Sequence, residues 1–247
     1  MFKKIQCFVV ALAWYSCTLA NNTVLVKDTY PQAYNWYVDV AQKYPQAQLK
    51  TISFAACTSH HADDKVIFFP KSILESINQN YAYVLAGSNV SDKYLEFLYT
   101  QEYLLLHEAY HANNAHMTQG KIASALFFAT GATITIISIW MTLLTQPYVS
   151  RALIAQSVAG NITLASCLIR HMRLQERDAD HFANQTASKQ ALTAGIAWHE
   201  SNYQDFKLSP QATIIEQKLT AAQADLHHPS PMIRKQRAEQ VYKTRFN

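Results

Sequence analysis

Cysteine is scarce in this chain of 247 residues, which contains only four. Cys7 and Cys17 fall in the first twenty residues, so Cys57 and Cys167 are the only two left in the rest of the chain. One possible pair makes no disulfide framework, and a small disulfide-stapled scaffold is therefore excluded. Cys167 lies in an apolar stretch, which predicts a buried thiol. A chain of this length can instead bury one good hydrophobic core.

Charge of either sign is also in short supply. Lys and Arg number 21 against 17 Asp and Glu, a formal net charge of +4. Without Lys3 and Lys4, 19 basic residues stand against 17 acidic ones, which leaves +2. So small a charge does not favour binding to nucleic acid or to an acidic membrane surface. The sequence therefore predicts no nucleic-acid partner.

Residues 1–20 have the pattern of an export segment. Lys3 and Lys4 make a basic start, Ile5 to Trp14 is mostly apolar, and small residues close the segment near Ala20. This order is typical of a secretory signal peptide, with an uncleaved N-terminal anchor as the alternative. Both interpretations place the following chain outside the cytoplasm, because the two lysines favour the cytoplasmic side.

Helix breakers are missing from Tyr94 to His116, where there is neither proline nor glycine. Apolar residues recur there at helical spacing, and Ser91 and Asp92 are suitable N-terminal caps. We expect one helix from about 92 to 117.

That helix contains His107-Glu108-Ala109-Tyr110-His111, an H-E-x-x-H pattern. Two histidines four apart lie on one helix face with their Cβ atoms about 6 Å apart, so both can reach one tetrahedral Zn²⁺. Glu108 would lie beside the metal, where it can take a proton from the attacking water. The alternative is a core helix with two hydrogen-bonded histidines, which leaves Glu108 unexplained.

A zinc enzyme of this kind needs a third protein ligand. The metzincin pattern fails, since Met117 stands where the third histidine should be and Asn114 where the glycine should be. His116 is five residues after His111, which turns it off the ligand face. A later helical stretch offers Glu176, with Asp180 on the same face to orient a ligand histidine. A solvated helix surface is the alternative for that stretch.

Three motifs in order resemble the HtpX and CAAX-prenyl-protease family of zinc metallopeptidases. They are H-E-A-Y-H followed by A-N-N-A-H, then E-R-D-A-D about 65 residues later, then His228-Pro229 followed by Arg234. The resemblance implies one Zn²⁺ per chain held by His107, His111 and Glu176, with Glu108 as base and Asp180 behind the ligands. It also implies that His228 and Arg234 lie near the substrate cleft. Tyr110 departs from the small residue that is usual before the second histidine, which puts the shape of the cleft in doubt.

Between these motifs lie two runs without charge. Residues 122–144 make about 34 Å of helix, enough to cross a bilayer, and 152–169 make a second, less apolar run. We expect 122–169 to be a transmembrane helical hairpin with its turn near Pro147. A pair of buried helices in a globular or oligomeric protein is the alternative. The family resemblance supports the hairpin, because related proteases also carry hydrophobic helices here.

The N-terminal part carries weaker patterns. Tyr30 to Tyr44 is helical in character, and Leu49–Phe54 and Lys65–Phe69 are short strand candidates. An edge strand beside the H-E-x-x-H helix would bind an extended peptide by backbone pairing. The candidate consists of the following residues: Val66, Ile67, Phe68 and Phe69. His60, His61, Asp63 and Asp64 could bind a metal, but a polar surface turn explains them as well.

Later in the chain, Ser209-Pro210 and Ser230-Pro231 are suitable starts for two helices. His227 and His228 would lie in the loop between them, where one could donate to the oxyanion of the reaction or belong to an ordinary loop. His199 and Glu200 are expected at the surface.

The sequence thus predicts a mainly α fold with a small β-sheet (α+β). The expected domain is a zincin-type catalytic unit over 21–247 with the hydrophobic hairpin inserted. We expect a membrane-associated zinc endopeptidase that acts on unfolded or membrane-proximal polypeptides, with membrane lipid as its other partner and its catalytic domain extracytoplasmic. The alternatives are a non-catalytic, zinc-containing membrane adaptor or chaperone-like protein, and a membrane interaction protein without metal.

Overall fold

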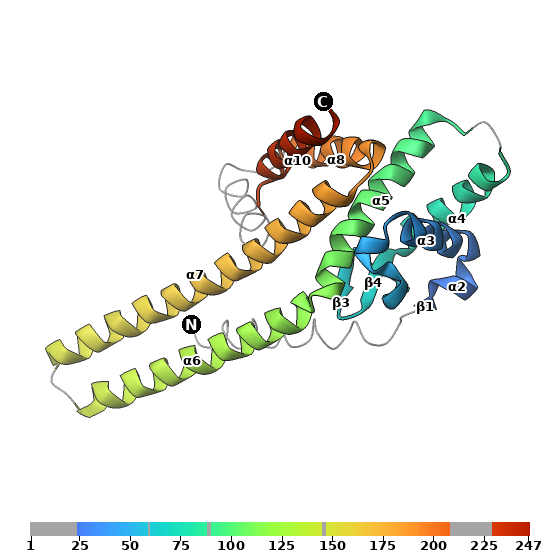
Figure 1. Cartoon of the computed structure of the whole chain (residues 1–247). Helices are drawn as coiled ribbons and strands as arrows, with labels where there is room; N and C mark the ends of the chain where they lie inside the picture. Colours follow the sequence, from blue (N-terminus) through green and yellow to red (C-terminus); the bar gives the residue numbers. More distant parts are fainter. Residues whose placement is uncertain (1–23, 59, 88–89, 145–146, 208–228) are drawn as a thin grey trace.

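The structure is a computed structural model that describes residues 24–58, 60–87, 90–144, 147–207 and 229–247. Helices dominate it, and one small mixed sheet lies in the N-terminal part (Figure 1), so the expected α+β organisation is confirmed. The leader (1–20), the Ser209-Pro210 helix start and the loop with His227 and His228 lie outside the described residues.

The N-terminal part packs two helices against the sheet. Its elements are β1 (Val24–Leu25), α2 (Val26–Thr29), α3 (Pro31–Lys43), the 3-10 turns η2 (Pro45–Ala47) and η3 (Leu49–Thr51), β2 (Ser53–Cys57), β3 (His61–Asp63), β4 (Val66–Pro70) and α4 (Lys71–Leu85). Trp36 and Tyr37 of α3 pack their rings against Phe54, and Phe69 meets Trp36 and Phe54. This aromatic cluster forms the part of the core that fixes the sheet.

The sheet, with the strand order β1-β2-β4-β3, differs from the sequence prediction in one strand boundary and in the strand that forms its edge. The Leu49–Phe54 strand begins only at Ser53, because Leu49–Thr51 is a 3-10 turn. The Val66–Phe69 segment is a strand but not an edge strand, since β4 pairs with β2 on one side and β3 on the other. Its backbone is therefore already bonded on both sides, and the edge belongs to β3. The expected polar turn at His61 and Asp63 is that edge strand.

Helix α5 (Asp92–Asn113) carries the H-E-x-x-H residues and ends four residues earlier than predicted. Asn114 caps it by donating from Nδ2 to the Tyr110 carbonyl at 2.8 Å. Ala115 then takes a left-handed conformation with φ 52°, a sharp turn that residues other than glycine rarely adopt. The chain therefore changes direction before His116 instead of continuing the helix.

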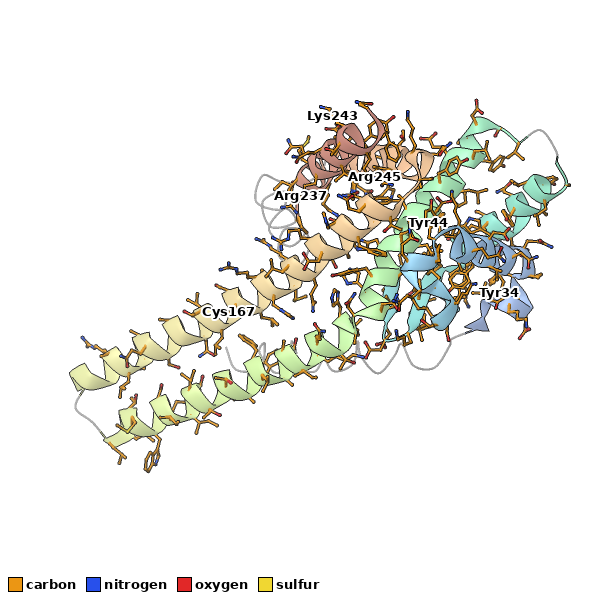
Figure 2. The ribbon with its side chains drawn as sticks, in the orientation of Figure 1. Tyr34, Tyr44, Cys167, Arg237, Lys243 and Arg245 are labelled. Carbon is orange, nitrogen blue, oxygen red and sulfur yellow. The ribbon has the colours of Figure 1, made fainter. Side chains whose placement is uncertain are left out.

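Helices α6 (His116–Leu144) and α7 (Pro147–Thr186) form a long hairpin that projects from the rest of the molecule (Figure 1). Both are long and apolar enough to cross a membrane, and each apolar stretch is only 6% buried within the protein. Cys167 lies about midway along α7 (Figure 2) and is exposed, so the prediction of a buried thiol is wrong.

Helix α7 continues without interruption from the hairpin into the body of the protein, where it packs against α5. Helix α8 (Lys189–Lys207) packs on α5, and α10 (Pro231–Phe246) packs on α8 and α7. The predicted start of the last helix is confirmed, with Ser230 as its N-cap and Pro231 as its first residue. Helices α7 and α8 thus pack against the helix that carries the H-E-x-x-H segment, and α10 packs behind them.

Candidate metal centre

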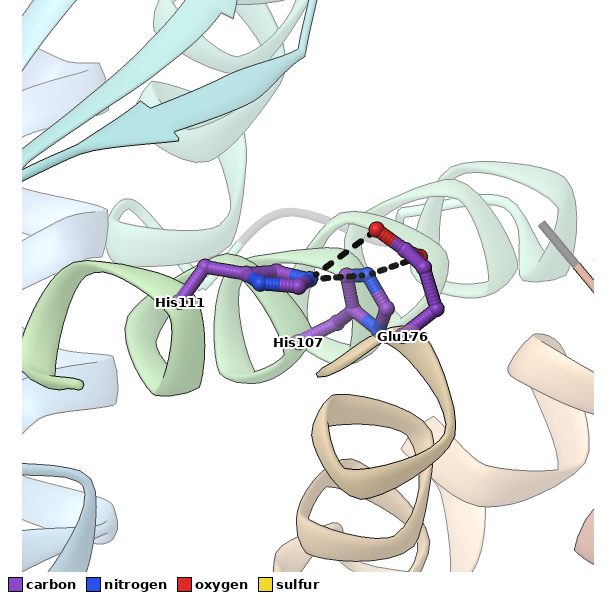
Figure 3. A group of neighbouring side chains, drawn as sticks. All are labelled: His107, His111 and Glu176. Atoms are coloured by element: carbon purple, nitrogen blue, oxygen red, sulfur yellow. Dashed lines mark hydrogen bonds and ion pairs between the residues drawn. The ribbon is translucent and has the colours of Figure 1, made fainter. Parts of the chain in front are cut away.

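Helices α5 and α7 bring three metal-ligand side chains together. His107 and His111 project from one face of α5 because they are one turn apart, and Glu176 of α7 meets them (Figure 3). The Nε2 atoms of the two histidines are 3.2 Å apart. Glu176 Oε2 lies 3.4 Å from His107 Nε2, and Glu176 Oε1 lies 3.3 Å from His111 Nε2. One donor atom from each residue lies within 4.8 Å of the others, so the group can bind a metal ion.

The spacing of the two histidine nitrogens is close to that in a tetrahedral site. Ligand atoms about 2.0–2.1 Å from a tetrahedral Zn²⁺ are separated by about 3.3–3.4 Å, and the two Nε2 atoms are 3.2 Å apart, while each of them faces a different oxygen of the Glu176 carboxylate. Two imidazole nitrogens that face each other also need a proton or a cation between them, because their lone pairs repel. The donor set of two imidazole nitrogens and one carboxylate therefore has the chemistry of a zinc site, and its atoms lie close enough together to share one metal ion.

The local charge also favours a cation. Burial alone lowers the pKa of His107, but hydrogen bonding and charge interactions with Asp180 and Glu176 raise that pKa to about 10. A buried imidazole surrounded by carboxylates needs positive charge nearby. A bound metal ion would supply that charge while leaving the histidine neutral, as a ligand must be.

Asp180 lies directly behind the ligands, as its spacing from Glu176 predicts. Its Oδ1 is 3.1 Å from His107 Nδ1, although the ring is off the direction of a regular hydrogen bond. The carboxylate also accepts two hydrogen bonds from Arg234 of α10, at 2.8 Å from Nε and 2.5 Å from Nη2. Arg234 was expected at the substrate cleft; the structure instead places it behind Asp180 with only 8% of its surface exposed.

A second buried polar group flanks this ion pair. Tyr103, one turn before His107, donates from its hydroxyl to Asn184 Oδ1 at 3.0 Å and contacts His199 Nε2 at 3.2 Å. His199 is 1% exposed, so its expected surface position is wrong. Gly195 lets α8 approach closely, since a Cβ there would lie 2.6 Å from the Tyr103 ring.

The position of His199 had a signal in the sequence. Ala191, Gly195 and His199 are spaced four apart and therefore share one face of α8, and the small residues identify that face as the packed one. Burial and the charge of Arg234 lower the pKa of His199 to about 3, so the side chain is neutral in the folded protein.

His116 is closer to the site than its spacing in a continuous helix predicted. Its Nδ1 lies 2.8 Å from His111 Nδ1. The cause is the turn at Ala115, which starts a new helix at His116 and folds its side chain back toward α5. His116 is therefore placed to orient His111, while the other ring nitrogen of His111 faces Glu176.

Glu108 faces the edge strand β3. His60, just before β3, contacts Gln101 Oε1 at 3.1 Å, and the Lys65 amide donates to the Ala112 carbonyl at 3.3 Å. The contact near the start of β3 falls on Gln101 and the contact just after its end falls on Ala112, so β3 runs beside α5 in the same direction. Gln101, Glu108 and Ala112 share one helix face, and the charge of Glu108 acts on His60.

The described structure thus brings together His107, Glu108, His111, Glu176, Asp180 and Arg234 from the predicted set. Ile67 and Phe69 are fully buried core residues of β4, and neither they nor Val66 and Phe68 offer a free strand edge. The chain matches no protein-family model, no curated protein and no solved structure.

Proposed function

We propose that the protein is a membrane-bound, zinc-dependent endopeptidase with a zincin-type site. The observation that carries this proposal is the convergence of His107, His111 and Glu176, whose donor atoms lie within 4.8 Å of one another, with Glu108 next to His107 on the same helix. Zinc held by the three side chains would polarise the scissile carbonyl and make water a stronger nucleophile.

The residues of the chain itself would supply proton transfer and orientation. Glu108 accepts the proton of the attacking water and passes it to the nitrogen as the C–N bond breaks, so each hydrolysis consumes one water. Asp180 Oδ1 lies 3.1 Å from His107 Nδ1, where it would orient the ring once a metal is bound, and Arg234 holds Asp180 through two hydrogen bonds. Such orientation of a ligand by a carboxylate keeps the histidine nitrogen aimed at the metal.

The edge strand β3 is the proposed substrate-binding element. Among the described strands it pairs only with β4, and it passes Glu108 on its way along α5. An extended polypeptide can add to a free strand edge through backbone hydrogen bonds. Binding of this kind recognises the substrate backbone more than its side chains, which suits substrates in an unfolded or extended state.

Replacing Glu108 by Gln tests the proposal, because Gln keeps the size and helix preference of the residue but accepts no proton. We expect one zinc per chain in metal analysis, and casein cleavage reduced at least about 10²-fold, the scale of general acid–base catalysis. Glu96→Gln on the exposed side of the same helix is the matched control and should cleave like the parent. Equal cleavage by E108Q and the parent would contradict the mechanism, and zinc without any cleavage by the parent would indicate a structural zinc site.

The location is part of the same proposal. The two helices are long and apolar enough to cross a membrane, which supports a membrane hairpin, and the basic leader favours an extracytoplasmic catalytic domain. Lys121 and Arg170, at the two ends of the hairpin nearest the metal centre, would lie on that side.

A further inference from the structure

The metal group is joined to the two apolar helices by short paths, a two-residue turn between α5 and α6 and the continuous helix α7. Helix α6 starts at His116, which contacts His111, and its uncharged run starts six residues later, at Ile122. On α7 the uncharged run ends at Ile169, and Glu176 follows on the same helix seven residues later. At a rise of about 1.5 Å per residue, both paths put the metal group roughly 10 Å from the end of the apolar runs.

Two contacts connect the first turns of α6 to neighbouring elements near this height. Gln175 Nε2 of α7 donates to Gln119 Oε1 of α6 at 3.1 Å. Lys121, the last charged residue before the apolar run, lies 3.6 Å from Asp63 Oδ2 at the end of β3. The edge strand proposed to bind substrate is therefore tied to the boundary of the apolar segment, just as the metal group is.

These distances can be compared with a bilayer. A hydrocarbon layer of about 30 Å within a total of about 40–45 Å leaves roughly 5–8 Å of headgroups on each side. A group about 10 Å above the hydrocarbon lies just outside the headgroups. An extended chain covers about 3.3–3.6 Å per residue, so a polypeptide leaving the membrane reaches this height within about three residues.

From this arrangement we infer that the protein cuts membrane-anchored polypeptides at a fixed height, about three residues beyond the hydrocarbon layer of the bilayer. The inference rests on the proposed peptidase function and adds the substrate class and the cleavage position. The hairpin acts as a ruler: distance from the membrane, more than side-chain sequence, selects the bond. A polypeptide without an anchor would bind the same edge strand with no preferred position.

The test uses a substrate that offers the same bond at every height. A single transmembrane helix is followed by six copies of one short unit that the purified protein cleaves as a soluble peptide, and both proteins are reconstituted in phosphatidylcholine vesicles. Mass spectrometry of the products gives the cleavage position. We expect cleavage confined to the copy next to the membrane, and cleavage of all copies in the same repeat without its transmembrane helix.

A matched variant moves the metal group further from the membrane. Seven residues inserted after Lys121 and seven after Arg170 add two helical turns to both helices, lift the site about 10.5 Å and turn it by only about 20°. Cleavage should move outward by about three residues. Equal cleavage of all copies in the anchored repeat by the parent protein would overturn the ruler while leaving the peptidase function intact. Failure to cleave even the soluble peptide would instead refute the proposed function.

Discussion

The ion pair between Arg234 and Asp180 allows a quantitative prediction. Arg234 is 8% exposed and Asp180 1%, and two hydrogen bonds join them. Replacing Arg234 by Met keeps an apolar stem of similar length but leaves the Asp180 carboxylate buried without its cation. Breaking a buried pair in this way costs about 3–5 kcal/mol, so we expect the free energy of unfolding to fall by about 4 kcal/mol.

The double variant shows whether the two residues act as a unit. Asp180→Asn removes the charge that Arg234 neutralises, so Arg234→Met should cost less in that background than in the parent. Residues in direct contact show coupling energies of about 0.5–3 kcal/mol, and the two hydrogen bonds favour the upper half of that range. We expect a coupling of about 2 kcal/mol.

Thermal unfolding of the detergent-purified, metal-free protein, followed by tryptophan fluorescence, measures both effects. For a chain of this size about 4 kcal/mol corresponds to a fall in Tm of roughly 8–16 °C. Arg237→Met, less than one turn further along α10 at an exposed position (Figure 2), is the matched control and should stay within about 0.5 kcal/mol of the parent. If R234M melts with R237M, or the double variant is additive within about 0.5 kcal/mol, Arg234 does not hold Asp180 in place.

Four further predictions concern the metal, the pH dependence and the membrane. Asp180→Asn should weaken zinc binding about 10–100-fold in a chelator competition, because His107 loses the carboxylate that orients it. Glu176→Ala should lose its zinc in metal analysis, and full occupancy would remove Glu176 from the ligand set. The pKa of His199 is lowered to about 3 in the folded protein, so the unfolded chain takes up a proton first and the free energy of unfolding falls with acid below about pH 6.5. His199→Gln should reduce this fall in the free energy of unfolding between pH 7 and 5 by about 2 kcal/mol. An unchanged fall would mean that His199 is not buried in its neutral form. With Cys57 and Cys167 removed, single cysteines at positions 119 and 187 should react with an impermeant reagent in intact cells, and one at 147 should not. The reverse pattern would place the metal centre in the cytoplasm. Release of the whole protein by alkaline carbonate would rule out a membrane hairpin.

The parts of the site that the sequence predicts correctly depend on helical periodicity. The pairs His107 with His111 and Glu176 with Asp180 each lie four apart, and that spacing puts each pair on one face wherever the helix goes. The apolar runs are equally local, since length and absence of charge are properties of the segment alone. These features needed no knowledge of the tertiary fold.

The errors come from features that depend on tertiary contacts. The edge position of β3 depends on the strand order, which the composition of Val66–Phe69 does not encode. Ala115 adopts φ 52° although it is not glycine, so the break before His116 had no residue signal. Arg234 is about 54 residues from Asp180 in the chain, and only the packing of α10 on α7 joins them.

The formal charges around the metal centre explain why these distant residues belong together. Three carboxylates contribute three negative charges, those of Glu108, Glu176 and Asp180. Arg234 contributes one positive charge next to the buried Asp180. Two negative charges remain beside two imidazoles, and a bound divalent cation would balance them. Without Arg234 the excess would be three, which a single Zn²⁺ could not neutralise, and the buried Asp180 would bear most of the imbalance. The helix α10 therefore serves the metal centre through charge, even though it contributes no ligand.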